Sequence, residues 1–88
     1  MSQFEFKITA EDGRARAGRL ETPHGTIEVP SFVAVGTQAT VKGISSEELR
    51  KIGIQAIIAN TYHLHLRPGE DLIEKMGGLH RFMNWDGP

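Results

Sequence analysis

The most informative stretch of this sequence is Ala59-Asn60-Thr61-Tyr62-His63-Leu64-His65-Leu66-Arg67-Pro68-Gly69. It directly follows an apolar run, Ile54 to Ile58, which predicts a buried strand. The chain then becomes polar at once, so Asn, Thr, Tyr and His stand together at the carboxyl end of that strand. Because α/β folds bind ligands at the carboxyl ends of their parallel strands, we expect a ligand site at this edge.

Another strand and a well-defined helix precede this edge. Ser31 to Gly36 contains four consecutive apolar residues and ends in glycine, which is typical of a parallel strand buried on both faces. Ser45 and Glu48 have the spacing of a capping box, so they predict the start of a helix. Gly53 stands where a left-handed C-cap residue belongs and predicts the end of that helix.

A second helix is predicted directly after the polar edge, opened by Pro68-Gly69 and ended by Gly77-Gly78. The order strand-helix-strand-helix over residues 31–88 is that of parallel βα units. Two such units cannot close a barrel or cover a sheet on both faces. The large apolar residues Phe82, Met83 and Trp85 also have no later element to cover them. We therefore expect the front part of a larger α/β protein, or a chain completed by another chain.

Residues 1–30 predict an antiparallel β meander. Phe4, Phe6 and Ile8 alternate with polar residues, as in a strand with one buried face. Glu11-Asp12-Gly13 supplies turn residues before the next strand. The predicted strands are Phe4 to Thr9, Ala15 to Leu20 and Thr26 to Val29.

Composition is that of an ordinary soluble protein: 88 residues, 39% hydrophobic, with a net charge of −1. This balance gives no global attraction to nucleic acid, so any RNA contact must be local. Arg14, Arg16 and Arg19 could form a phosphate-binding strip, but neighbouring acidic residues favour a solvated strand edge. The absence of cysteine excludes disulfides and thiolate metal ligands within the chain. Neither a signal peptide nor an apolar run of about 20 residues is present, so we expect a cytoplasmic protein without membrane contact.

The polar edge offers several candidate groups. Asn60 can both donate and accept hydrogen bonds, which suits a ribose hydroxyl or a base edge, although capping backbone groups explains it equally well. His63 and His65 would share one face of an extended chain, but a metal site needs a third ligand, so structural roles are favoured. Tyr62 is interpreted as a packed aromatic residue. Arg67 could bind a phosphate or form a surface salt bridge. These residues form no catalytic constellation.

Several motifs, in order, resemble the N-terminal quarter of the tRNA-guanine transglycosylases, also called queuine tRNA-ribosyltransferases, and fit the bacterial and eukaryotic branch best. They are Thr22-Pro23-His24-Gly25, Pro30-Ser31-Phe32-Val33-Ala34-Val35-Gly36-Thr37-Gln38-Ala39-Thr40-Val41-Lys42, Asn60-Thr61-Tyr62-His63-Leu64, Leu66-Arg67-Pro68-Gly69 and Gly77-Gly78-Leu79-His80-Arg81-Phe82-Met83.

This resemblance implies a TIM (β/α)₈ barrel: an antiparallel β cap over residues 1–30, then the first two βα units over 31–88. It implies an enzyme that exchanges guanine at the anticodon wobble position of tRNA for queuine or a 7-deazaguanine precursor. One aspartate attacks the ribose, and a second acts as general acid/base. The family also has a structural zinc ion and assembles as a homodimer, or as a heterodimer of family subunits.

Carried over residue by residue, the resemblance assigns Val35, Ile58 and Asn60 to the pocket for the target nucleoside. It assigns Thr37, Thr40, Lys42 and Phe82 to the dimer interface. The family's catalytic aspartates and zinc ligands have no counterparts in these 88 residues, and Asp86 does not replace them. We therefore expect the chain alone to be inactive. The alternative is a short non-catalytic paralogue or accessory subunit that keeps the dimerisation and tRNA-facing surface.

Overall fold

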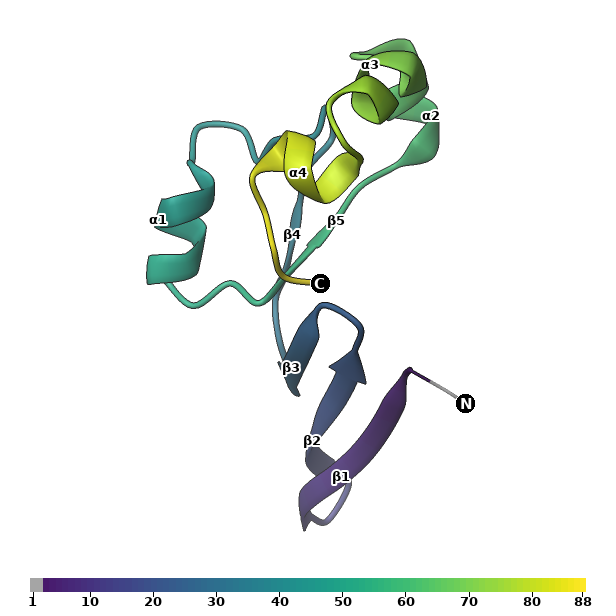
Figure 1. Ribbon diagram of the computed structural model, residues 1–88. Helices are drawn as coiled ribbons and strands as arrows, with labels where there is room; N and C mark the ends of the chain where they lie inside the picture. The colour runs from purple at the N-terminus through teal and green to yellow at the C-terminus, as the bar shows by residue number, and fades with distance from the viewer. Residues whose placement is uncertain (1–2) are drawn as a thin grey trace.

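Two separate β-sheets organise residues 3–88, the part of the chain that this computed structural model describes. Strands β1 (Glu5–Asp12), β2 (Ala15–Thr22) and β3 (Gly25–Val29) form an antiparallel sheet in the order β1-β2-β3. Strands β4 (Val33–Val35) and β5 (Ala56–Ile58) form a parallel pair. Figure 1 shows the antiparallel sheet at one end of the molecule and the parallel pair, with the helices around it, at the other.

Four short helices accompany the parallel pair within the described residues. Helix α1 (Ser46–Lys51) connects β4 to β5. After β5 the chain forms α2 (Thr61–Leu66), α3 (Glu70–Lys75) and α4 (Leu79–Met83). The sequence predicted α1 and α3, but not α2 or α4. Two residues, Ala59 and Asn60, separate the end of β5 from the first residue of α2.

The antiparallel sheet has the predicted meander, with Phe6 opposite Leu20 and Leu20 opposite Ile27. A bulge between Ile8 and Ala10 interrupts the first pairing. The expectation that β1 has one buried face is wrong, because every residue of β1 is exposed. Within residues 3–88 no second layer covers β1, so its alternating pattern has nothing to pack against, whereas Ile27 of β3 is buried.

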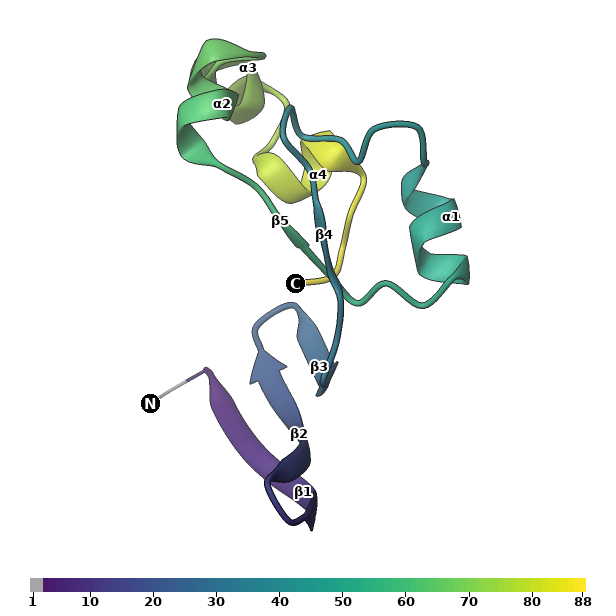
Figure 2. The same cartoon turned by 180° about the vertical axis from the view of Figure 1, so that it is seen from behind.

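The parallel pairing of β4 and β5 is confirmed, with Val33 opposite Ala56 and Val35 opposite Ile58. The prediction that β4 is buried on both faces is wrong. Ala34 is buried, whereas Val35 on the other face is 61% exposed. The physical reason is that α1 and the C-terminal segment cover only one face of the pair (Figure 2).

Helix α1 carries the predicted end signals. The Glu48 backbone N–H donates to the Ser45 hydroxyl at 3.2 Å, and the Ser45 backbone N–H donates to the Glu48 carboxylate at 3.1 Å. At the other end Gly53 has a φ of 91°, which favours glycine. The Gly53 and Ile54 N–H groups donate back to the Arg50 and Leu49 carbonyls, completing a Schellman motif.

A small core joins β4, α1 and the C-terminal segment through Ala34, Leu49 and Trp85. Trp85 has no later element to cover it, as expected, but it is buried because the earlier elements β4 and α1 cover it. Its indole N–H donates to the Pro88 carbonyl at 2.9 Å, and the Arg50 guanidinium lies 5.4 Å from its ring centroid. The Ser46 hydroxyl also donates to the Met83 carbonyl. Residues 83–88 thus fold back onto α1.

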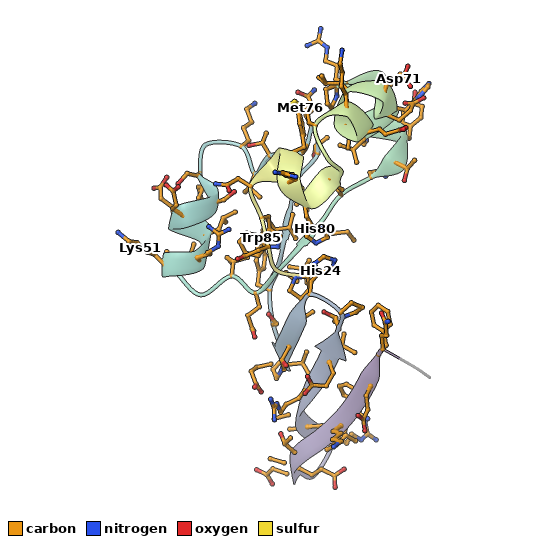
Figure 3. All side chains as sticks on the ribbon, in the orientation of Figure 1. His24, Lys51, Asp71, Met76, His80 and Trp85 are labelled. Atoms are coloured by element: carbon orange, nitrogen blue, oxygen red, sulfur yellow. The ribbon has the colours of Figure 1, made fainter. Side chains whose placement is uncertain are left out.

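The molecule is elongated, with a radius of gyration of 14.9 Å. A compact domain of this length would have a radius of gyration of about 12 Å. Few groups connect the two halves: the Gln55 side chain reaches β3, and the imidazoles of His24 and His80 stack with centroids 3.7 Å apart (Figure 3).

We expect Ser45→Ala to destabilise the protein by about 1 kcal/mol, because it removes the acceptor for the Glu48 N–H. Ser45→Asp retains an acceptor and is the matched control. Thermal unfolding of both variants measures the difference. Equal stability of Ser45→Ala and wild type would show that the capping box contributes nothing.

We also expect the 88-residue chain to associate at micromolar concentration, because Val35 and Ile58 expose apolar surface beside an open sheet edge. Light scattering should give a mass above that of a monomer, and Val35→Thr with Ile58→Thr should lower it. A stable monomer with cooperative unfolding would contradict this expectation.

Candidate functional site

Asn60 is the N-cap of α2. Its backbone is extended, with φ −124° and ψ 123°, and its side-chain oxygen accepts from the Tyr62 N–H at 2.9 Å. Asparagine is among the preferred N-cap residues because its short side chain reaches the free N–H groups of the first turn. The backbone-capping interpretation is therefore confirmed, although the group capped is a helix start and not a strand end. Within residues 3–88 the amide nitrogen of Asn60 makes no hydrogen bond.

A cavity of about 260 Å³ lies at the carboxyl ends of β4 and β5. The structure brings Val35, Ile58 and Asn60 together around it, and these are the residues that the sequence analysis grouped in one pocket. Thr37, Ala59 and His63 complete the lining. Parallel pairing explains the arrangement, because Val35 and Ile58 are register partners at the ends of their strands.

A second hollow of about 400 Å³ adjoins this cavity, since Val35 and Thr37 line both. It gathers Thr37, Thr40 and Lys42, which the resemblance assigned to a dimer interface. Phe82 lies on α4 and does not line this hollow. The loop folds around Ala39, which is buried and has a φ of 61°, in the left-handed region that favours glycine.

The idea that His63 and His65 share a face is wrong, because both lie in α2 and not in an extended segment. Residues two apart on a helix point about 200° from one another. His63 lines the cavity, whereas the His65 Nδ1 lies 2.7 Å from the Glu70 carboxylate on α3. Residues 3–88 bring no three His, Asp or Glu side chains together as a metal site.

The other two candidates at the polar edge have solvent-facing positions. Tyr62 is 65% exposed, so its interpretation as a packed residue is wrong; its ring meets the His63 ring edge-on. Arg67 is the C-cap of α2 and forms no ion pair within the described part of the chain. By contrast, Arg19 pairs with Glu21 and Glu28, so acidic neighbours neutralise it as expected, although it lies on β2, the middle strand of the antiparallel sheet, and not at a sheet edge.

An apolar groove of about 590 Å³ separates α2 from α3. Leu64, Ile73 and Leu79 form its walls, and the His65–Glu70 pair stands beside them. The Glu70 backbone N–H and the His65 imidazole hold the pKa of the Glu70 carboxyl below its ordinary value of 4.5. The sequence did not predict this pair, because His65 was expected on an extended segment and not on a helix.

The cavity offers groups that could contact a ligand but few that could react with it. Its lining contains apolar walls, one amide, one hydroxyl and one imidazole, and no carboxylate. Asp86 is directed elsewhere, since it lies 3.3 Å from the Arg50 guanidinium. No helix among residues 3–88 has the length and apolar character needed to cross a bilayer.

The fold and the cavity define an α/β protein with a candidate binding site at the carboxyl edge of its parallel strands. The sequence pattern described as queuine tRNA-ribosyltransferase matches residues 11–88, and the chain belongs to this family. A queuine tRNA-ribosyltransferase of Thermoanaerobacter sp. (strain X514) is 59% identical over 88 residues, covering 98% of this chain and 24% of that protein. One of Clostridium tetani (strain Massachusetts / E88) is 62% identical over 84 residues, covering 94% of this chain and 22% of that protein. The chain thus spans about a quarter of the length of the curated relatives it matches.

We expect Glu70→Gln to be less stable than wild type at pH 7, with a difference that narrows as the pH falls below 4.5. A carboxyl whose pKa is lowered by folding contributes stability above its ordinary pKa of 4.5 and loses that contribution as the pH falls through its folded value. Melting curves between pH 7 and pH 3 measure the gap, and Glu74→Gln on the same helix is the control. A difference in stability that does not narrow as the pH falls below 4.5 would contradict the linkage.

Proposed function

We propose that this chain forms the N-terminal part of a tRNA-guanine transglycosylase, a pentosyltransferase that exchanges guanine at the anticodon wobble position for queuine or a 7-deazaguanine precursor. The family match over residues 11–88 supports this function. The observation that links this function to a particular site is the cavity lined by Val35, Ile58 and Asn60.

In this proposal the cavity receives the ribose of the target nucleoside. Val35 and Ile58 present apolar walls to the sugar ring, and the amide nitrogen of Asn60 donates to a ribose hydroxyl. His63, which the sequence analysis left out of the pocket, stands beside them. The nucleotide must leave the stack of the anticodon loop to reach such a cavity, as in other enzymes that act on a base.

The same proposal places β4 and β5 as the first two strands of a (β/α)₈ barrel, with the antiparallel sheet as a cap. The Ile58 carbonyl bonds to Gly36 beside β4, so the Ile57 backbone groups face the opposite edge of β5. The Ile57 N–H donates there to the Pro88 carbonyl at 3.1 Å. A further parallel strand would join at this edge, and such strands require cover on both faces.

The catalytic aspartates belong, in this proposal, to parts of the enzyme outside these 88 residues, and the chain alone is inactive. The same applies to the structural zinc ion. Zinc favours cysteine and histidine ligands. This chain has no cysteine, and its described residues form no cluster of three other ligands, so they do not fit a zinc site.

The hollow around Thr37, Thr40 and Lys42 is the proposed contact for a second family subunit, either a copy of this protein or a paralogue. Phe82 would reach the same partner from α4. The tRNA anticodon loop and the replacement base are the other partners, and we place the reaction in the cytoplasm.

The second candidate is an accessory subunit without catalysis. The observation that favours it is a cavity without any carboxylate in its lining. The coding sequence discriminates the two: an open frame after Pro88 that encodes the catalytic aspartates supports the enzyme, and an immediate stop codon supports the subunit.

We expect Asn60→Asp in the complete enzyme to lower kcat/KM for tRNA about fivefold while leaving the melting temperature unchanged. Aspartate retains the acceptor for the Tyr62 N–H but loses the amide donor, whose hydrogen bond contributes about 1 kcal/mol. Asn60→Ala should lower both quantities, because it removes the cap as well. Steady-state base exchange and thermal unfolding measure the two effects.

Asn84→Asp is the matched control, because Asn84 is exposed and does not line the cavity. Unchanged kcat/KM in Asn60→Asp would remove Asn60 from the substrate site and leave it as a helix cap only.

A further inference from the structure

The Gln55 side chain behaves as one residue of an additional strand. Its Oε1 accepts from the Glu28 backbone N–H at 2.7 Å, and its Nε2 donates to the Glu28 carbonyl at 3.0 Å. A carboxamide can do this because it has the same donor and acceptor as a peptide group. Glu28 lies in β3, whose other edge pairs with β2, so Gln55 occupies the edge that the sheet leaves open.

The second Nε2 hydrogen of Gln55 donates to the Ser31 hydroxyl at 3.2 Å. Ser31 lies between β3 and β4, so one amide contacts the antiparallel sheet and the segment that leads into the parallel pair. Both Nε2 hydrogens and the Oε1 atom have partners, and all three distances are those of ordinary hydrogen bonds.

Gln55 directly precedes β5, the strand that delivers Ile58 and Asn60 to the cavity. Strand β5 has three residues, so its ladder with β4 fixes its position along the strand axis only weakly. A displacement of β5 by one residue moves its carboxyl end by about 3.3 Å and reverses its faces. The Gln55 amide opposes such a displacement, because it must stay aligned with one peptide unit of β3.

We propose that Gln55 is a positioning residue: by clamping the start of β5 to Glu28 it sets the depth at which Asn60 reaches the cavity. Its effect on catalysis rests on the proposed function, whereas its effect on Asn60 does not. The clamp acts through backbone geometry, since Gln55 itself lies at the opposite end of β5 from the cavity.

The direct test uses Gln55→Met in the complete protein, with amide exchange and chemical shifts read at single residues. We expect the Glu28 amide to exchange at least tenfold faster, and the resonance of the Tyr62 amide, which Asn60 caps, to shift. Gln3→Met is the matched control, because Gln3 is exposed and outside both sheets. Unchanged Glu28 exchange overturns the clamp, and faster exchange without a Tyr62 shift overturns the positioning role.

A second variant, Gln55→Glu, keeps the size of the side chain but loses the donors at neutral pH. Protonation of the introduced carboxyl restores one donor below about pH 4.3. Its melting temperature should therefore approach that of wild type between pH 7 and pH 4. A gap that is constant over this range contradicts the clamp, even where Gln55→Met does not fold.

Base-exchange kinetics show whether a negative result contradicts the role of Gln55 or the proposed function. Where base exchange is present, Gln55→Met should lower kcat/KM for tRNA about fivefold per folded molecule, and unchanged kinetics overturn a role in catalysis. If no form of the protein exchanges bases while the Glu28 and Tyr62 signals change as expected, the proposed function fails and the positioning role stands.

Discussion

The parallel pairing of β4 with β5 determines where the candidate site residues lie. Each strand has three residues, and the Gly36 N–H extends the ladder by donating to the Ile58 carbonyl at 2.8 Å. This register puts Val35 beside Ile58, and the loops that follow carry Thr37 and Asn60 to the same cavity. A slip of one residue would turn Ile58 to the opposite face of the pair and remove it from the cavity.

A ladder of only three residue pairs depends for its stability on the side chains that pack against it. Ala34 lies under Leu49 and Trp85, and this contact joins the pair to α1 and to the last residues of the chain. Arg50 reinforces the contact by donating to the Asn84 carbonyl at 2.9 Å while its guanidinium lies near the indole ring. These interactions cover one face only. On the opposite face Val35 and Ile58 stay exposed at the carboxyl ends of the strands, where the cavity lies, whereas Ala56 at the start of β5 is buried.

Features encoded by local chemistry could be predicted from the sequence. The limits of α1 follow from Ser45, Glu48 and Gly53, because caps depend on residues within one turn of the helix end. The parallel order followed from the alternation of strand and helix signals. Burial could not be predicted, because it depends on layers distant in sequence: β1 alternates correctly and is nevertheless exposed.

The polar stretch after β5 shows most clearly what could not be predicted from the sequence. Asn60 starts α2 through a hydrogen bond to Tyr62, but the same residue also suited the end of a strand, and the apolar run before it favoured that interpretation. Because a strand was assumed, neither the place of His63 in the cavity nor the contact of His65 with Glu70 was predicted. Both follow from helical geometry, which directs the two rings to different sides. The grouping of Val35, Ile58 and Asn60 came from the resemblance and not from the assigned secondary structure, so this error did not affect it, and the pocket they form for a nucleoside stays a prediction.

Capping and binding by Asn60 are compatible because they use different atoms. The side-chain oxygen is held by the Tyr62 N–H, and this bond orients the carboxamide plane. The amide nitrogen at the other side of the plane has no partner among residues 3–88 and belongs to a residue that lines the cavity. A donor fixed by a helix cap loses little side-chain entropy when a ligand accepts from it. The bond that begins α2 therefore also prepares the donor that the proposed substrate would meet.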